Sequence, residues 1–163
     1  MKAHLPSTRR LHLVDIENLV GCPRPTLAMA TACRDEYANR LRIGNDDLVV
    51  LACNHGAALE VGPAWPGCRL RVRSGPDGAD RALLDVLKSE SVEDRFGSVV
   101  IGSGDGCFTE AVAQLRVAGI EVTVAATAHS LSRRLALVAS RVVLLDPTPA
   151  PPSVHVALVA EAA

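Results

Sequence analysis

Three aspartates occupy positions where the predicted fold would place reactive groups. Asp15 directly follows a short apolar run, Asp80 lies in the first turn of a predicted helix, and Asp105 lies in a glycine-rich turn. In an open parallel sheet, the carboxyl ends of the strands line the ligand crevice. Carboxylates that converge there without basic partners repel one another, so such a site is stable only when a cation enters it. Mg²⁺ or Mn²⁺ fits, because hard cations take oxygen ligands and pairs of such ions promote phosphodiester hydrolysis.

The turn that carries Asp105 is the most distinctive stretch of the chain. The β-branched run 99–101 predicts a buried parallel strand, and three glycines within 102–106 allow a tight turn with close backbone approach. Apolar residues at helical spacing follow through 108–115. Asp is also a good helix N-cap, so capping alone is the competing interpretation of Asp105.

A second polar group follows the first predicted strand, 11–14. Asp15, Glu17 and Asn18 are expected in a loop at the carboxyl end of this strand. Asp and Asn also serve ordinary turns by bonding to nearby backbone, which is the alternative interpretation. Three polar groups exceed what a turn needs, and this favours a site.

Apolar periodicity predicts strands that alternate with helices along the chain. The predicted strands cover 11–14, 48–53, 69–73, 98–101, 120–125 and 141–145, and the predicted helices cover 26–42, 57–61, 79–90, 109–118 and a last segment capped by Ser130. This order is typical of a doubly wound parallel sheet with helices on both faces. The run 69–73 alternates Arg with apolar residues, as edge strands do, although such a row could also meet a phosphate backbone.

Composition indicates one α/β domain with a core of small aliphatic side chains. Hydrophobic residues make up 48% of the 163 residues but aromatic residues only 2%, so Ala, Val and Leu must build the interior. The domain is predicted to cover 1–146, followed by a proline-rich tail over 147–163. An interaction through this tail, in a homodimer or with a protein partner, is left open. The net charge of −1 gives no global basic field for nucleic acid.

Cysteine usage and hydropathy predict a cytoplasmic protein with no membrane association. The five cysteines include no CxxC pair, which argues against a structural zinc site. Residues 1–10 lack the apolar segment of a signal peptide, and no apolar run reaches the length of a membrane helix.

Three blocks of the sequence together resemble the signature of NYN domains, which belong to the PIN-like nuclease superfamily. They are Val-Asp-Ile-Glu-Asn-Leu at 14–19, Gly-Ala-Asp at 78–80 and Ser-Gly-Asp-Gly-Cys-Phe at 103–108, and they occur in the family's order. The resemblance spans most of 11–145. It implies a Rossmann-like (PIN-like) α/β/α sandwich with a mostly parallel sheet, and divalent-metal-dependent cleavage of RNA.

The same resemblance implies a role for each matching residue. Asp15, Asp80 and Asp105 would be the catalytic carboxylates and the ligands of Mg²⁺ or Mn²⁺. Asn18 would orient the first carboxylate or the substrate, and Ser103 would support Asp105.

The sequence departs from the family at Cys107, where a second acid usually follows Asp105. A thiol suits Mg²⁺ badly. Two functions therefore stay open, a metal-dependent ribonuclease and an NYN-like RNA-binding or regulatory module with weak or absent catalysis. A receiver-type phosphate-binding regulator fits less well, because no acceptor Asp follows the third predicted strand.

RNA contacts are expected from arginines near the predicted crevice. Arg133 and Arg134 open the last predicted helix and are predicted to hold RNA phosphates, with Arg81 a weaker candidate. A solvated helix face is the alternative interpretation.

Overall fold

Six parallel strands form the centre of the molecule. The computed structural model describes residues 8–148. The strands are β1 (Arg10–Asp15), β2 (Leu48–Cys53), β3 (Arg69–Val72), β4 (Ser98–Gly102), β5 (Glu121–Thr127) and β6 (Arg141–Leu145), in the spatial order β3-β2-β1-β4-β5-β6. Every neighbouring pair is parallel. Val- and Leu-rich runs suit this arrangement, because strands of a parallel sheet are buried on both faces.

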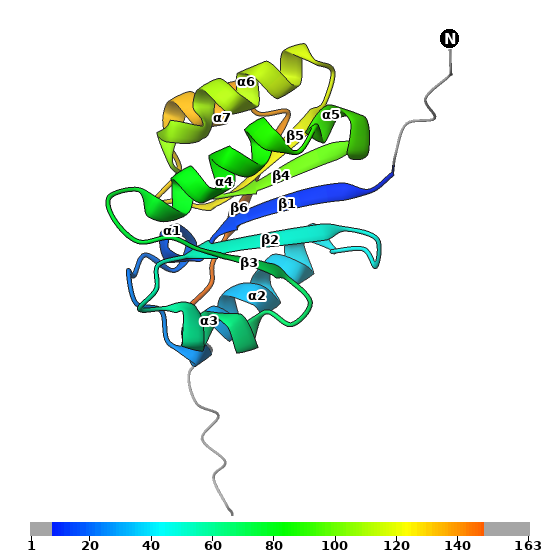
Figure 1. The fold of residues 1–163 in the computed structure, drawn as a ribbon. Helices are drawn as coiled ribbons and strands as arrows, with labels where there is room; N and C mark the ends of the chain where they lie inside the picture. Colours follow the sequence, from blue (N-terminus) through cyan, green and yellow to red (C-terminus); the bar gives the residue numbers. More distant parts are fainter. Residues whose placement is uncertain (1–7, 149–163) are drawn as a thin grey trace, which may run out of the picture.

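Helices cover both faces of this sheet (Figure 1). One face carries α1 (Ile16–Val20), α2 (Leu27–Leu41) and α3 (Ala58–Ala64), and the other carries α4 (Gly78–Ser89), α5 (Val92–Arg95), the 3-10 turn η1 (Gly106–Phe108), α6 (Thr109–Val117) and α7 (Arg133–Val138). The predicted α/β Rossmann-like sandwich is therefore confirmed. Within residues 8–148, no helix is long and apolar enough to cross a bilayer. Most of the predicted tail, 149–163, lies outside the described residues.

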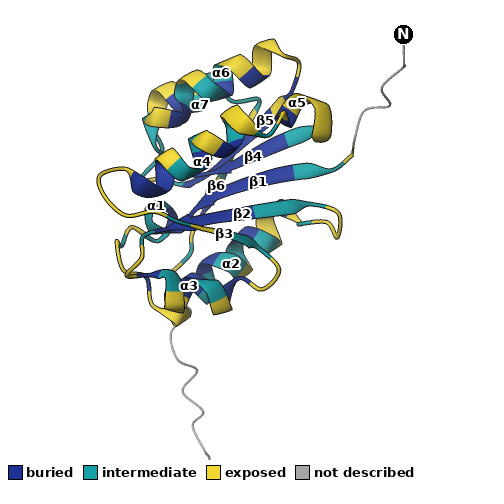
Figure 2. Ribbon diagram, viewed as in Figure 1, coloured by how far each residue is buried: buried dark blue, intermediate teal, exposed yellow. Residues whose placement is uncertain are grey.

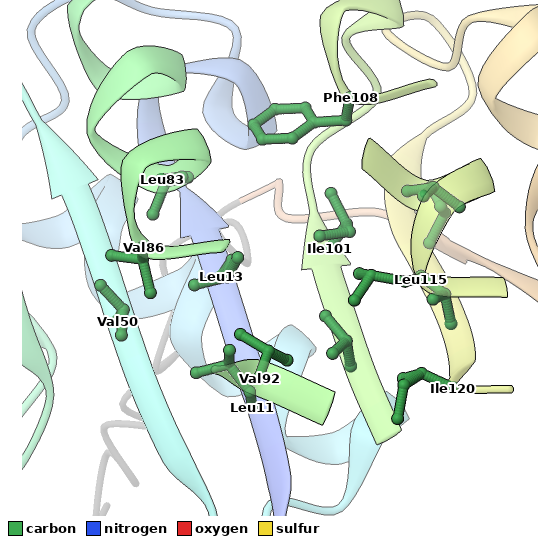
Figure 3. Packing of buried hydrophobic residues seen from close by; sticks show 14 of the residues in the cluster. Leu11, Leu13, Val50, Leu83, Val86, Val92, Ile101, Phe108, Leu115 and Ile120 are labelled. Atoms are coloured by element: carbon green, nitrogen blue, oxygen red, sulfur yellow. The ribbon is translucent and has the colours of Figure 1, made fainter. Parts of the chain in front are cut away.

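Strand β1 is anchored from both sides by buried side chains (Figure 2). Leu11 and Leu13 belong to the hydrophobic cluster under α4 and α6, together with Leu83 and Phe108 (Figure 3). Val14 points to the opposite cluster, which lies against α1, α2 and α3. Full burial of one such Leu contributes ~1.5–3 kcal/mol. The end of β1, where Asp15 lies, is thus held in a fixed position.

The order of the strands reverses between β1 and β4. From β1 the chain continues through helices on one face toward β2 and β3, and from β4 it continues through helices on the other face toward β5 and β6. Folds of this kind bind ligands outside the carboxyl ends of the strands at this switch point. In Figure 1 these ends lie beside α1.

Several short elements differ from the predictions. Residues Glu17 and Asn18 were expected in a loop but belong to α1, a helix of five residues that is too short to show apolar periodicity. Helix α3 continues through Pro63, because Val61 and Ala64 bury against the sheet. Helix α5 was not predicted. The N-cap of α7 is Ser132 and not Ser130, whose hydroxyl instead bonds to that of Thr127.

The arginines of edge strand β3 make intramolecular ion pairs. Arg69 and Arg71 both reach Glu90, and Arg73, just beyond the strand, pairs with Asp85. These pairs span from the strand to α4 and to the residue that follows it. The structural interpretation of the Arg row is therefore favoured for Arg69 and Arg71.

Candidate metal centre

Asp15, Asp80 and Asp105 line one open pocket of about 580 Å³ at the carboxyl edge of the sheet, here called the carboxylate pocket. They come from the end of β1, the start of α4 and the loop after β4. The pocket also contains Glu17, Asn18, Arg24, Asn54, Arg73 and Asp77. The structure thus brings together the three aspartates that the strand-end argument singled out.

Asp15 is held in place by the start of α1. Its carboxylate accepts a hydrogen bond from the backbone N–H of Asn18 at 3.2 Å, so Asp15 does cap this helix. The residue is only 5% exposed, and its carboxyl group lies in hydrogen-bonding contact with that of Asp80. Burial first, and then the charge of Asp80, raise the pKa of Asp15 to about 8. The pair of Asp15 and Asp80 is therefore expected to hold one proton at neutral pH in the metal-free chain.

Asp80 lies in the first turn of α4, with its side chain 7% exposed. The close approach that places it there needs a glycine, because a Cβ on Gly78 would lie 2.3 Å from the carbonyl oxygen of Arg73. Burial raises the pKa of Asp80, and the nearby charge of Asp105 adds to the shift. Its buried Oδ1 atom has no hydrogen-bond partner. A buried oxygen without a donor is costly, and a cation would satisfy it.

Asp105 lies in the loop between β4 and η1. Its carboxylate accepts the backbone N–H of Cys107 at 2.7 Å, and the hydroxyl of Ser103 accepts the backbone N–H of Asp105 at 3.2 Å. Capping is therefore present, as the competing interpretation requires. A carboxylate has about four acceptor positions, so one cap bond leaves Asp105 able to bind a cation as well.

Cys107 lies beside two of the three aspartates. One ligand atom each from Asp80, Asp105 and Cys107 can be chosen so that all three lie within 4.8 Å of one another. Desolvation of the thiol, and then the charges of Asp80 and Asp105, raise the pKa of Cys107. The thiol is therefore protonated in the metal-free chain.

Asn18 joins the loops that follow β1 and β4. Its side-chain oxygen accepts the backbone N–H of Gly104 at 2.9 Å. The carbonyl of Gly104 in turn accepts the N–H of Ser132 at 2.8 Å, at the start of α7. The amide of Asn18 thus positions the backbone next to Asp105, and its own backbone N–H positions Asp15.

The arginines of the carboxylate pocket are not the ones that sequence reasoning selected. Arg24 and Arg73 line the pocket, whereas Arg133 and Arg134 are exposed at the start of α7 and do not line it. The guanidinium of Arg134 nevertheless lies beside the glycine-rich turn, 3.6 Å from the Cβ position of Gly106. The strand-end rule would have found Arg73, which directly follows β3, but not Arg24, which lies beyond α1.

Among the described residues, no ion pair with Lys, Arg or His reaches Asp15, Asp80 or Asp105. Three carboxyl groups that line one pocket without an ion pair, and one orphaned oxygen among them, make a donor set that fits a divalent cation. Asp15 lies outside the cluster of Asp80, Asp105 and Cys107 whose ligand atoms are within 4.8 Å of one another. The hard oxygens suit Mg²⁺ or Mn²⁺, and the sulfur of Cys107 adds a soft donor.

Comparisons with known proteins extend the description of the fold. No protein-family model matches this sequence. A search of curated proteins finds no match either. The structure is similar to the crystal structure of a protein of unknown function from Vibrio parahaemolyticus RIMD 2210633, with a TM-score of 0.55 and 15% identity, over 90% of this chain and 96% of that one. At this identity the likeness concerns the fold alone.

Proposed function

We propose that this protein is a divalent-metal-dependent ribonuclease of the NYN type, using Mg²⁺ or Mn²⁺ held by Asp15, Asp80 and Asp105. The observation that carries the proposal is the carboxylate pocket at the switch point of the sheet, with its unneutralised aspartates and the orphaned oxygen of Asp80. The three sequence blocks that resemble NYN domains supply these same aspartates. When bound, such cations activate water and stabilise the leaving oxygen of a phosphodiester.

The chain's own residues would divide the remaining work. Asn18 and Ser103 hold the backbone around Asp15 and Asp105 in place through the hydrogen bonds described above. Arg24 and Arg73 lie on the pocket wall, where guanidinium groups can bind phosphate oxygens. Asp15 and Asp80 would both have to be deprotonated to hold the cation, so metal binding would release the proton of this pair to solvent.

Cleavage of RNA is expected to require both the metal and Asp105. Incubating the chain with structured and single-stranded RNAs in Mn²⁺ should yield products that disappear with a chelator. Asp105→Asn should slow cleavage at least ~100-fold, which corresponds to a loss of about 2.7 kcal/mol of transition-state stabilisation. Asp46→Asn removes the same charge from an exposed position before β2, at the opposite edge of the sheet, and is the matched control. Cleavage that survives the chelator or Asp105→Asn would rule the proposal out.

Arg24 is expected to contact the RNA backbone more strongly than Arg133 or Arg134. Arg24 lines the carboxylate pocket and has no ion-pair partner among the described residues, whereas the other two lie outside the pocket. In the Asp105→Asn background, which blocks cleavage, Arg24→Gln should weaken binding of single-stranded RNA and reduce the slope of log K against log salt by ~0.7. A larger effect from the double change Arg133→Gln and Arg134→Gln would place the phosphate path along α7 instead.

A binding module is the second candidate function, and Cys107 is the observation that favours it. Where the resembling family has a second acid, the thiol supplies neither a hard oxygen nor a charge in the metal-free chain. RNA binding with a metal response but no cleavage, across the same panel of RNAs, would support this candidate.

A further inference from the structure

Cys107 lies where a metal ligand would lie. Its sulfur and one oxygen each of Asp80 and Asp105 are mutually within 4.8 Å, a spacing that small side-chain rotations can close around one ion. The backbone restricts the position of the thiol, because the N–H of Cys107 is bonded to the carboxylate of Asp105. The backbone of Cys107 therefore stays beside the carboxylate of Asp105, and rotation about χ1 alone moves the sulfur toward or away from the cluster.

An independent observation points to a ligand at this cluster. Asp80 is 93% buried, and its Oδ1 atom has no hydrogen-bond donor. Among residues 8–148 no ion pair reaches Asp80, and Arg73, on the same pocket wall, is paired with Asp85. A cation is the simplest group that would satisfy this oxygen and the charge of Asp105 together.

Cys107 has no evident structural role. It is exposed, forms no disulfide and belongs to neither hydrophobic cluster. Phe108, the next residue, supplies the packing of η1 in the core. A substitution at Cys107 should therefore leave the fold intact.

We propose that Cys107 is a metal ligand through its sulfur, and that Asp80, Asp105 and Cys107 form a mixed oxygen and sulfur centre. Thiolate ligands favour Zn²⁺ and its chemical neighbours, whereas Mg²⁺ demands oxygen. Catalytic zinc sites likewise have three protein ligands and keep a further coordination position open for water or substrate. The centre is thus expected to bind Zn²⁺ and Co²⁺ through the thiolate, and to bind Mg²⁺ through the carboxylates alone. This inference rests on the proposed function, because it concerns the same pocket.

Cobalt spectroscopy tests this inference without any measure of activity. Co²⁺ added to the reduced, metal-free chain should give the near-ultraviolet charge-transfer band of a sulfur–cobalt bond. Cys107→Ser should abolish the band and weaken Zn²⁺ binding at least tenfold, while Mg²⁺ binding by calorimetry changes less than about twofold. Cys68→Ser is the matched control, because Cys68 precedes β3 at the opposite edge of the sheet and is a free thiol as well. It should leave the band and both affinities unchanged.

The outcomes separate this inference from the proposed function. If the wild-type chain binds Mn²⁺ or Co²⁺ with no sulfur band, and Cys107→Ser binds equally well, the carboxylates alone hold the ion. The ribonuclease proposal then stands and the thiolate ligand is rejected. If the wild-type chain binds none of the four cations, both proposals fail. Partial loss of folding is excluded by comparing the melting temperatures of the three proteins.

Discussion

Replacing Asp80 with Asn is expected to raise the melting temperature of the metal-free chain and to abolish its stabilisation by Mn²⁺. Asp80 and Asp15 are both buried, share a proton and have no basic partner. Asn is nearly the same size, and its amide can donate to the carboxylate of Asp15. Loss of the favourable charge at the start of α4 costs ~0.3–1 kcal/mol. Removal of a buried charge that has no basic partner should exceed this, with a net gain of ~1–2 kcal/mol, or about 2–8 °C at this chain length.

The stability that Asp80→Asn gains over the wild type should increase as the pH rises. The folded pKa of Asp15 is raised to about 8, well above its ordinary value of 3.8. A group with a raised folded pKa contributes its full stability below the unfolded pKa and loses it as the pH rises through the folded pKa. The metal-free wild-type chain should therefore lose stability between about pH 4 and pH 8. Asp80→Asn lowers the pKa of Asp15, so its advantage over the wild type should grow across the same range.

Thermal unfolding with and without Mn²⁺, at pH 5 and pH 8, measures both effects. A cation at 100 times its dissociation constant should stabilise the wild type by ~2.7 kcal/mol. Asp80→Asn should show no such response. Asp46→Asn, at an exposed position before β2 and at the opposite edge of the sheet, should keep the full response. If Asp80→Asn melts lower at both pH values and still responds to Mn²⁺, then Asp80 serves α4 and not a cation.

The inner strands could be predicted because each is dominated by buried β-branched or Leu residues, and edge strand β3 could be predicted from its alternation of Arg with apolar residues. Burial on both faces of a parallel sheet dictates that composition, so β4 and β5 are visible directly in the sequence. The short helices could not be predicted in the same way. Five residues of α1 and four of α5 do not complete the periodicity that identifies a helix. The formation of α1 and α5 depends on capping residues and on packing against residues that are distant in sequence.

The position of the site could be predicted from the sheet topology, but the other residues that line the pocket could not. Asp15 and Asp105 follow strands that flank the switch point, so their proximity is dictated once the sheet is known. Arg24 enters the pocket because the loop after α1 folds back beside Asn54, whose side chain bonds to the carbonyl of Pro23. A single hydrogen bond across 31 residues leaves no local pattern in the sequence. The nearness of Cys107 to Asp80 likewise depends on the packing of η1 against α4.

Gly104→Ala is expected to be strongly destabilising, although the backbone of Gly104 does not have a positive φ. A Cβ at this position would lie 2.3 Å from the carbonyl oxygen of Ser130 and 2.7 Å from the nitrogen of Leu131. Both are backbone atoms of the loop before α7, so no side-chain rotation can relieve the clash. Separation of the two loops would also weaken the hydrogen bonds that Gly104 makes with Asn18 and Ser132.

The expected loss is the sum of these effects. Overpacking costs ~1–3 kcal/mol, and two hydrogen bonds contribute ~0.5–1.5 kcal/mol each, so Gly104→Ala should lower the unfolding free energy by about 2–6 kcal/mol. Gly106→Ala is the matched control in the same turn, because its Cβ would meet only the hydroxyl of Ser132, at 3.0 Å, and that side chain can rotate. Denaturant unfolding of the two variants compares them directly. The loop around Gly104 also carries Asp105, so Gly104→Ala should weaken Mn²⁺ binding in the fraction that remains folded. Equal stability of the two variants would mean that the loop before α7 yields freely, and the carboxylate pocket would then lack the rigid wall on which its geometry depends.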